Sequence, residues 1–175
     1  VKSSTRVIRR MLKQCNVENT PRFTLNNVKC LGRVIDVYDG DTLTIAVLLS
    51  HTGEPLPTAF QVRMLGYDSP EVRTLNDKEK TQAVLARDAL RALVWNKIVW
   101  VEFSVSDKYG RWLAHLWCHC RRMRTSTGNS NKCIVVPATD DAWGPPPPNP
   151  EQEWIHVNEF MLGNTDSCEY LGKGP

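Results

Sequence analysis

The chain has 175 residues, a length typical of one domain. Its 41% hydrophobic and 23% charged residues are those of a globular protein and exclude disorder along the whole chain. No apolar run approaches the roughly 20 residues of a membrane span, so we expect none. The net charge of +3 is too small to indicate a polyanionic partner by itself, and the six cysteines are too sparse for a disulfide-built scaffold.

The beginning of the chain is basic. Five cations and no acid occur between Val1 and Lys13, while Val7, Met11 and Cys15 repeat at helical spacing. This pattern predicts a basic amphipathic helix, and we treat residues 1–30 as an N-terminal basic extension. Three interpretations of the helix stay open: a remnant of a transit sequence, a nucleic-acid arm, or a helix docked on the core, which is slightly favoured.

Strands come next. Gly32–Tyr38, Thr42–Leu49 and Ala59–Tyr67 are rich in β-branched and apolar residues, which predicts a three-stranded meander. The Asp39-Gly40 pair between the first two predicts a two-residue turn in which Gly40 takes a positive φ.

A helix follows the meander. Asn76 is the expected N-cap, with Glu79 at the capping-box position. The apolar residues expected on one buried stripe of this helix are Ala83, Ala86, Leu90, Leu93 and Val94. Two more strands, Ile98–Val105 and Arg111–Cys118, are joined by a turn that ends in Gly110. This order predicts an α+β, mainly β fold: a five-stranded OB-fold barrel with an inserted helix.

The domain predicted for residues 31–175 contains a long proline-rich loop insertion at 121–153. Ile134–Val136 is a candidate short strand inside the insertion, and Val157–Leu162 a candidate final helix. The run from His115 to Cys120, with Cys133, holds ligand types that zinc accepts but has no CxxC pair. Reduced or core-packed thiols are therefore favoured over a structural metal.

Four charged residues are candidates for chemistry. Asp41, Asp68 and Glu71 lie at or just past strand ends, where loops carry functional groups, although ordinary turn or surface chemistry is the favoured explanation of each of them alone. Arg63 lies inside an apolar strand and needs a buried or clustered anionic partner. We therefore consider the four together.

Four motifs in order resemble the staphylococcal nuclease (thermonuclease) family, with every charged position filled. They are Asp39-Gly40-Asp41-Thr42, the segment from Val62 to Glu71, the segment from Asp107 to Arg111, and Val157-Asn158-Glu159. The resemblance implies an OB-fold barrel and a calcium-dependent phosphodiesterase that acts on DNA and RNA. It does not extend to the basic extension or to the insertion.

The resemblance also implies roles for individual residues. The groups it assigns to calcium are the carboxylates of Asp41 and Asp68 and the carbonyl of Ser69. Those it assigns to catalysis are Glu71, which activates the attacking water, and Arg63 and Arg111, which bind the scissile phosphate. The substrate contacts are Lys108 and Tyr109 near a neighbouring phosphate, with Tyr170 the candidate for base stacking.

These roles agree with elementary chemistry. Three carboxylates gathered in one site repel one another, so such a site needs a cation, and calcium accepts six to eight oxygen ligands in flexible geometry. Arginine offers a planar, permanently charged fork for the negative charge that develops on a phosphoryl group, which lysine does not reproduce.

The predicted function is a nuclease that hydrolyses DNA and RNA, single-stranded or locally opened, with little sequence preference. Attack by water would leave 3′-phosphate and 5′-hydroxyl ends, and we expect a monomer. The alternative is a non-catalytic OB-fold module that binds nucleic acid or protein. The filled charged set favours the enzyme.

Overall fold

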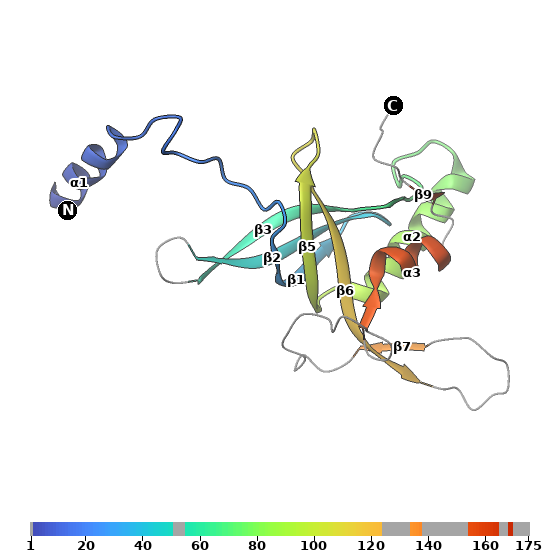
Figure 1. The fold of residues 1–175 in the computed structure, drawn as a ribbon. Coiled ribbons are helices and arrows are strands. Elements are labelled where there is room, and N and C mark those ends of the chain that lie inside the picture. Colours follow the sequence, from blue (N-terminus) through green and yellow to red (C-terminus); the bar gives the residue numbers. More distant parts are fainter. Residues whose placement is uncertain (1, 51–54, 124–133, 138–153, 165–167, 170–175) are drawn as a thin grey trace.

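A computed structural model describes residues 2–50, 55–123, 134–137, 154–164 and 168–169 of the chain (Figure 1). Its helices are α1 (Lys2–Leu12), α2 (Asp77–Val94) and α3 (Val157–Asn164). Its longer strands are β1 (Lys29–Val37), β2 (Thr42–Ser50), β3 (Pro55–Met64), β5 (Ile98–Ser106) and β6 (Trp112–Met123). Its shorter strands are β4 (Tyr67–Asp68), β7 (Ile134–Pro137), β8 (Trp154–His156) and β9 (Cys168–Glu169).

Five strands form a closed barrel. The antiparallel order is β3-β2-β1-β5-β6, and a parallel pairing of β3 with β6, from Val62 opposite Trp112 to Met64 opposite Ala114, closes it. Helix α2 is inserted between β4 and β5 and lies at one end of the barrel with α3 (Figure 1). The predicted α+β class and the five-stranded OB-fold barrel with an inserted helix are confirmed.

The core fills the barrel because alternate residues of each strand point inward. The fully buried side chains include Val34, Ile45, Val62, Val99 and Leu116. The predicted stripe of α2 is buried as expected, and Asn76 caps this helix by accepting hydrogen bonds from the N–H groups of Lys78 and Glu79. Glu79 does not complete the predicted capping box, because the Asn76 N–H donates to the Thr74 hydroxyl at 3.2 Å, and that hydroxyl donates to the Glu79 carboxylate at 2.7 Å.

The expectation of a positive φ at Gly40 is wrong. Among the described glycines, Gly66 and Gly110 have positive φ, at 93° and 82°, and Gly40 does not. Gly40 is instead required by space. A Cβ atom at this position would lie 2.8 Å from the side chains of both Ser69 and Ala86, so the turn before β2 packs directly against β4's loop and α2.

Asn158, the second residue of α3, ties the barrel closure together. Its side-chain carbonyl accepts from the Leu116 N–H at 3.0 Å, and its amide nitrogen donates to the carbonyls of Leu65 at 2.7 Å and Ala114 at 3.0 Å. It is 4% exposed, so none of these bonds is replaced by water at low cost. One buried side chain therefore joins α3 to β6 and to the end of β3.

Asn158→Ala is expected to lower the free energy of unfolding by about 3 kcal/mol, because it removes the side-chain partner of the Leu116 N–H and of the Leu65 and Ala114 carbonyls. Chemical denaturation monitored by tryptophan fluorescence measures this loss. Asn164→Ala is the matched control, since Asn164 is an exposed asparagine of the same helix with one hydrogen bond, to the Phe160 carbonyl. Equal stabilities of the two variants would contradict this role of Asn158.

The histidine and cysteine run of β6 points in both directions from the sheet. Cys118 is buried in the core, whereas the Nδ1 atom of His115 lies 3.1 Å from Nε2 of His156 on β8. Within the described ranges, no group of three or more His, Cys, Asp or Glu side chains is arranged to hold a metal. Cys133 lies outside these ranges.

Strand β7 confirms the predicted short strand in the insertion and pairs with β6.

The N-terminal extension has an exposed part and a part that packs on the barrel. Residues 5–20, which include most of α1, are exposed, so docking of this helix on the core is wrong, and Figure 1 shows α1 apart from the barrel. Leu25, in contrast, is 2% exposed, and the Asn27 N–H donates to the Phe103 carbonyl at 3.0 Å. In the part of the chain that the structure describes, no helix is long and apolar enough to cross a membrane.

Candidate active site

The turn between β1 and β2 buries a carboxylate. Asp41 is 2% exposed and accepts hydrogen bonds from the Thr42 hydroxyl at 2.8 Å and from the Ser69 N–H at 2.9 Å. The turn itself is held by the buried Tyr67 hydroxyl, which donates to the Gly40 carbonyl at 2.7 Å. These contacts fix the Asp41 carboxylate between β2 and the loop that follows β4.

Arg63 lies beside this carboxylate because β2 and β3 pair with Thr42 opposite Arg63. Its Nη1 atom is 3.4 Å from Oδ1 of Asp41, and its Nη2 atom donates to Oδ1 of Asp68. The Arg63 side chain is only 14% exposed. The expected anionic partner of this arginine is thus confirmed, and there are two.

Arg111 approaches the same place from the start of β6. Its Nε donates to Oδ2 of Asp107 at 2.8 Å, and its Nη1 donates to the Thr42 hydroxyl at 3.4 Å. Asp107 also accepts from the N–H groups of Tyr109 and Arg111, at 2.9 Å each. The turn that bears Gly110 therefore orients Arg111 from both its side chain and its backbone.

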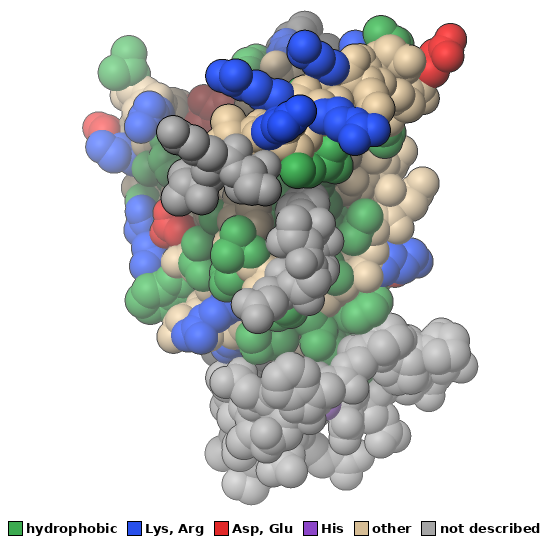
Figure 2. Space-filling view, turned by 90° about the vertical axis from the view of Figure 1, so that its left-hand side faces the viewer, with side chains coloured by type: hydrophobic (Ala, Val, Ile, Leu, Met, Phe, Trp, Pro, Cys, Tyr) green, Lys and Arg blue, Asp and Glu red, His purple; other side chains and the backbone are tan. Residues whose placement is uncertain are grey.

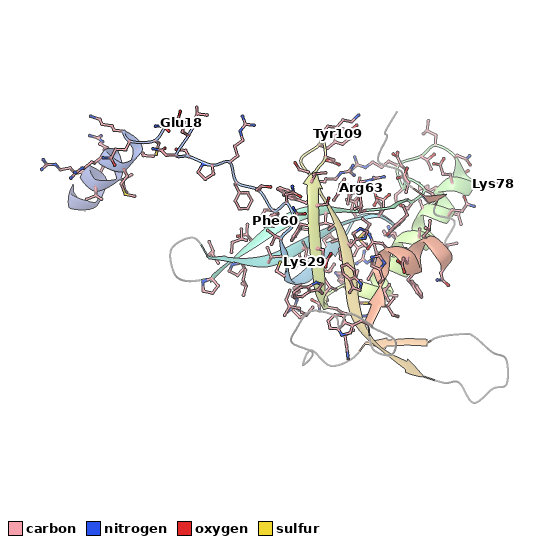
Figure 3. The ribbon with its side chains drawn as sticks, in the orientation of Figure 1. Glu18, Lys29, Phe60, Arg63, Lys78 and Tyr109 are labelled. Carbon is pink, nitrogen blue, oxygen red and sulfur yellow. The ribbon has the colours of Figure 1, made fainter. Side chains whose placement is uncertain are left out.

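These contacts form one continuous chain. Asp68 contacts Arg63, Arg63 contacts Asp41, and the Thr42 hydroxyl links Asp41 to Arg111. The structure thus brings together the side chains of both predicted arginines and both predicted aspartates, and Figure 3 shows Arg63 and Tyr109 at the same end of the barrel. Ser69 joins them through its backbone N–H.

The other predicted site residues lie at the edge of this chain or outside the described ranges. Glu71 is exposed and, among the described side chains, makes no hydrogen bond or ion pair, and no three carboxylates of the described residues are arranged to hold a metal. Tyr109 is 70% exposed, with Nζ of Lys108 5.1 Å from its ring centroid and the Arg111 guanidinium 5.4 Å from it. Tyr170 lies outside the described residues.

Asp41 and Asp68 both have pKa values above the ordinary value of an aspartate. Burial raises the pKa of Asp41, repulsion from Asp39 adds to this, and the Arg63 guanidinium offsets part of it. Burial also raises the pKa of Asp68 against the attraction of Arg63. Asp107 behaves differently: although burial opposes it, hydrogen bonds from the side chain and backbone of Arg111 lower its pKa. Burial therefore disfavours the ionised forms of Asp41 and Asp68, and Arg63 offsets part of this cost for each.

Calcium fits this arrangement. The candidate ligand atoms, which belong to the Asp41 and Asp68 carboxylates and to Ser69, are all oxygen atoms, and these suit a hard divalent cation. The Ser69 hydroxyl oxygen is buried, and among the described residues it has no hydrogen-bond partner. A cation beside Asp41 and Asp68 would stabilise their ionised forms, which burial disfavours. The fit rests on two carboxylates and Ser69, without Glu71.

Three residues that position the site were not selected as site residues from the sequence. Thr42 links Asp41 to Arg111, Asp107 orients Arg111, and Tyr67 holds the Gly40 turn. The sequence carried signals for two of them. Thr42 follows Asp41 directly, and Asp107 precedes Arg111 by four residues across a turn. Tyr67 had no comparable signal, because its partner is a backbone carbonyl distant in the sequence.

Comparison with known proteins agrees with this geometry. Residues 61–135 match the model of the family described as staphylococcal nuclease homologue, which confirms the resemblance over two of the four motifs, from Val62 to Glu71 and from Asp107 to Arg111. The matched range runs through the predicted residues from Arg63 to Arg111, and contains neither Asp41 nor Tyr170. Protein ParB of Escherichia coli is 31% identical over 86 residues, which are 49% of this chain and 41% of that protein. The chain therefore spans less than half the length of this relative.

Proposed function

We propose that this chain, whose residues 61–135 match the staphylococcal nuclease homologue family, is a calcium-dependent nuclease of DNA and RNA. Its substrates are single-stranded or locally opened nucleic acids, cut by water with little sequence preference. In this proposal residues 31–175 form the nuclease domain, with a loop insertion at 121–153, residues 1–30 form a basic extension, and the protein acts as a monomer.

The observation that carries the proposal is that Arg63 and Arg111 are linked through the Thr42 hydroxyl and the Asp41 carboxylate. Arg111 donates to Thr42, Thr42 donates to Asp41, and Arg63 lies 3.4 Å from the same Asp41 oxygen. Two guanidinium groups at one barrel end provide several N–H donors for the oxygens of a single phosphate. Such donors, held in place before substrate binds, stabilise charge that develops at phosphorus.

Asp41, Asp68 and Ser69 would hold calcium. The ion, when bound, supplies a Lewis acid for a phosphoryl oxygen and neutralises the two carboxylates. In the structure, Arg63 contacts both of these carboxylates. A cation that takes over part of their charge would leave guanidinium N–H groups of Arg63 for the phosphate.

Glu71 is assigned as the group that accepts a proton from the attacking water. It follows Ser69-Pro70 directly and is exposed, so a substrate and its water can reach the carboxylate from solvent. Lys108 and Tyr109 lie on the turn that carries Arg111, and the cation–ring contacts of Tyr109 keep positive charge at this edge for a neighbouring phosphate. Tyr170 keeps its assignment as a candidate for base stacking.

A specific observation favours the alternative, a non-catalytic OB-fold module that binds nucleic acid or protein. Arg63 is engaged by two carboxylates, and among the described side chains Glu71 makes no hydrogen bond or ion pair, an arrangement that does not by itself offer a complete catalytic set. A module of this kind would bind single-stranded DNA with and without calcium, and would not cut it.

Cleavage of labelled single-stranded DNA and RNA is expected to require calcium and to stop on addition of a chelator, because phosphate does not approach the Asp41 and Asp68 carboxylates without a cation. Magnesium should support less cleavage, since it demands stricter geometry and retains its waters. Gel analysis of the products, with parallel binding measurements, checks both statements. Binding without cleavage in calcium would establish the alternative, and equal rates in the two metals would reject this calcium site.

A further inference from the structure

Helix α1 exposes apolar side chains that the described protein does not cover. Val7, Ile8, Met11 and Leu12 are 56%, 52%, 63% and 65% exposed. A cluster of this kind is unfavourable in water, because burial of each of these apolar side chains lowers the free energy. Figure 1 shows the helix apart from the barrel, at the far end of the segment that leads to β1.

The cations of this segment occupy the opposite face of the helix. At about 100° per residue, Arg6, Arg9, Arg10 and the following Lys13 fall within an arc of roughly 100°, and the four apolar residues fall within a separate arc of roughly 140°. All four cations are exposed. The view onto this side of the molecule shows Lys and Arg side chains gathered beside hydrophobic ones (Figure 2).

Charge decides which partner suits both faces. No acid occurs before Glu18, which Figure 3 labels beyond the end of α1, so this segment is uniformly cationic. A nucleic acid would use the cations and leave the apolar face in water. A second copy would pair the apolar faces but bring two cationic helices together. The interface of an anionic membrane takes the apolar face at the acyl boundary and the cations among its headgroups.

We propose that α1 is a peripheral anchor that lies in the plane of an anionic phospholipid surface. The helix carries Arg6, Arg9 and Arg10 within 11 residues, a charge density that does not suit the bilayer interior, so it attaches to one leaflet and does so reversibly. The segment between α1 and the buried Leu25 then separates the barrel from the surface. The proposal does not depend on nuclease activity, because no residue of α1 belongs to the candidate site.

Flotation with lipid vesicles tests the anchor on the full chain. Binding to phosphatidylcholine vesicles that contain phosphatidylglycerol is expected to exceed binding to pure phosphatidylcholine by on the order of tenfold or more. The triple variant Ile8→Ser, Met11→Ser, Leu12→Ser keeps every charge and should weaken binding to the anionic vesicles by on the order of tenfold or more. Leu75→Ser is the matched control, since Leu75 is fully exposed but lies outside α1.

Each other outcome rejects the anchor. Equal binding of the triple variant and the wild-type chain to anionic vesicles would reduce the effect to surface charge. No vesicle binding by the wild type, together with loss of single-stranded DNA binding in an Arg9→Gln, Arg10→Gln variant, would make α1 a nucleic-acid arm. Concentration-dependent dimerisation that the serine variant abolishes, without vesicle binding, would assign the apolar face to a second copy. A thermal melt of each variant verifies that the barrel is folded.

Discussion

Replacing Arg63 by lysine is expected to lower the turnover of single-stranded DNA by on the order of a hundredfold or more, although the charge is kept. Arg63 sends one guanidinium nitrogen toward Asp41 and the other toward Asp68, so its two N–H groups reach separate oxygens in fixed directions. A lysine ammonium has neither this fork nor this reach. Single-turnover rates in calcium measure the loss.

The same variant also tests the fold, because Arg63 lies in β3 and is mostly buried between two carboxylates. Loss of an optimal partner for buried Asp41 destabilises the folded state, so a thermal melt must accompany the kinetics. Arg33→Lys is the matched control, since Arg33 is an exposed strand arginine that donates to Asn96 away from the site. A folded Arg63→Lys protein with a near-normal rate would remove Arg63 from the catalytic set.

Glu71→Gln is expected to depress turnover by roughly 10²–10⁴-fold while leaving substrate binding nearly unchanged. The substitution keeps the size and shape of the side chain and removes its capacity to accept a proton. Because Glu71 is exposed and makes no hydrogen bond among the described residues, the variant should melt like the wild type. Glu18→Gln is the matched control, an exposed glutamate that lies away from the barrel (Figure 3).

The ends of the products distinguish the role of Glu71 from other routes of cleavage. If Glu71 activates a water that attacks phosphorus in line, DNA is cut as well as RNA, and fragments carry 3′-phosphate and 5′-hydroxyl ends. Mass spectrometry of fragments from a DNA oligonucleotide measures this directly. Ends with 5′-phosphate, or cleavage of RNA alone with cyclic phosphate products, would contradict the assignment.

Local sequence patterns were sufficient for the elements of the barrel. Period-two apolar segments became β1, β2, β3, β5 and β6, and the stripe from Ala83 to Val94 became the buried face of α2. These patterns predict the elements because each barrel strand and each covering helix must bury one face, and this requirement sets the spacing of apolar residues along the chain. The motif around Arg63 likewise predicted a clustered anionic partner, since a strand arginine among apolar residues needs one.

Tertiary contacts decided what consecutive residues do not encode. The sequence indicated that Gly40 is a turn glycine. The structure shows that the side chains of Ser69 and Ala86, which are distant in the sequence, leave no space for a Cβ atom at this position. The pattern of residues 2–12 predicted a basic amphipathic helix without deciding its partner, and its exposure depends on whether the core offers a surface for it. Asp41, Thr42 and Arg111 meet because β3 pairs with β6, which closes the barrel and brings strand ends together across 69 residues.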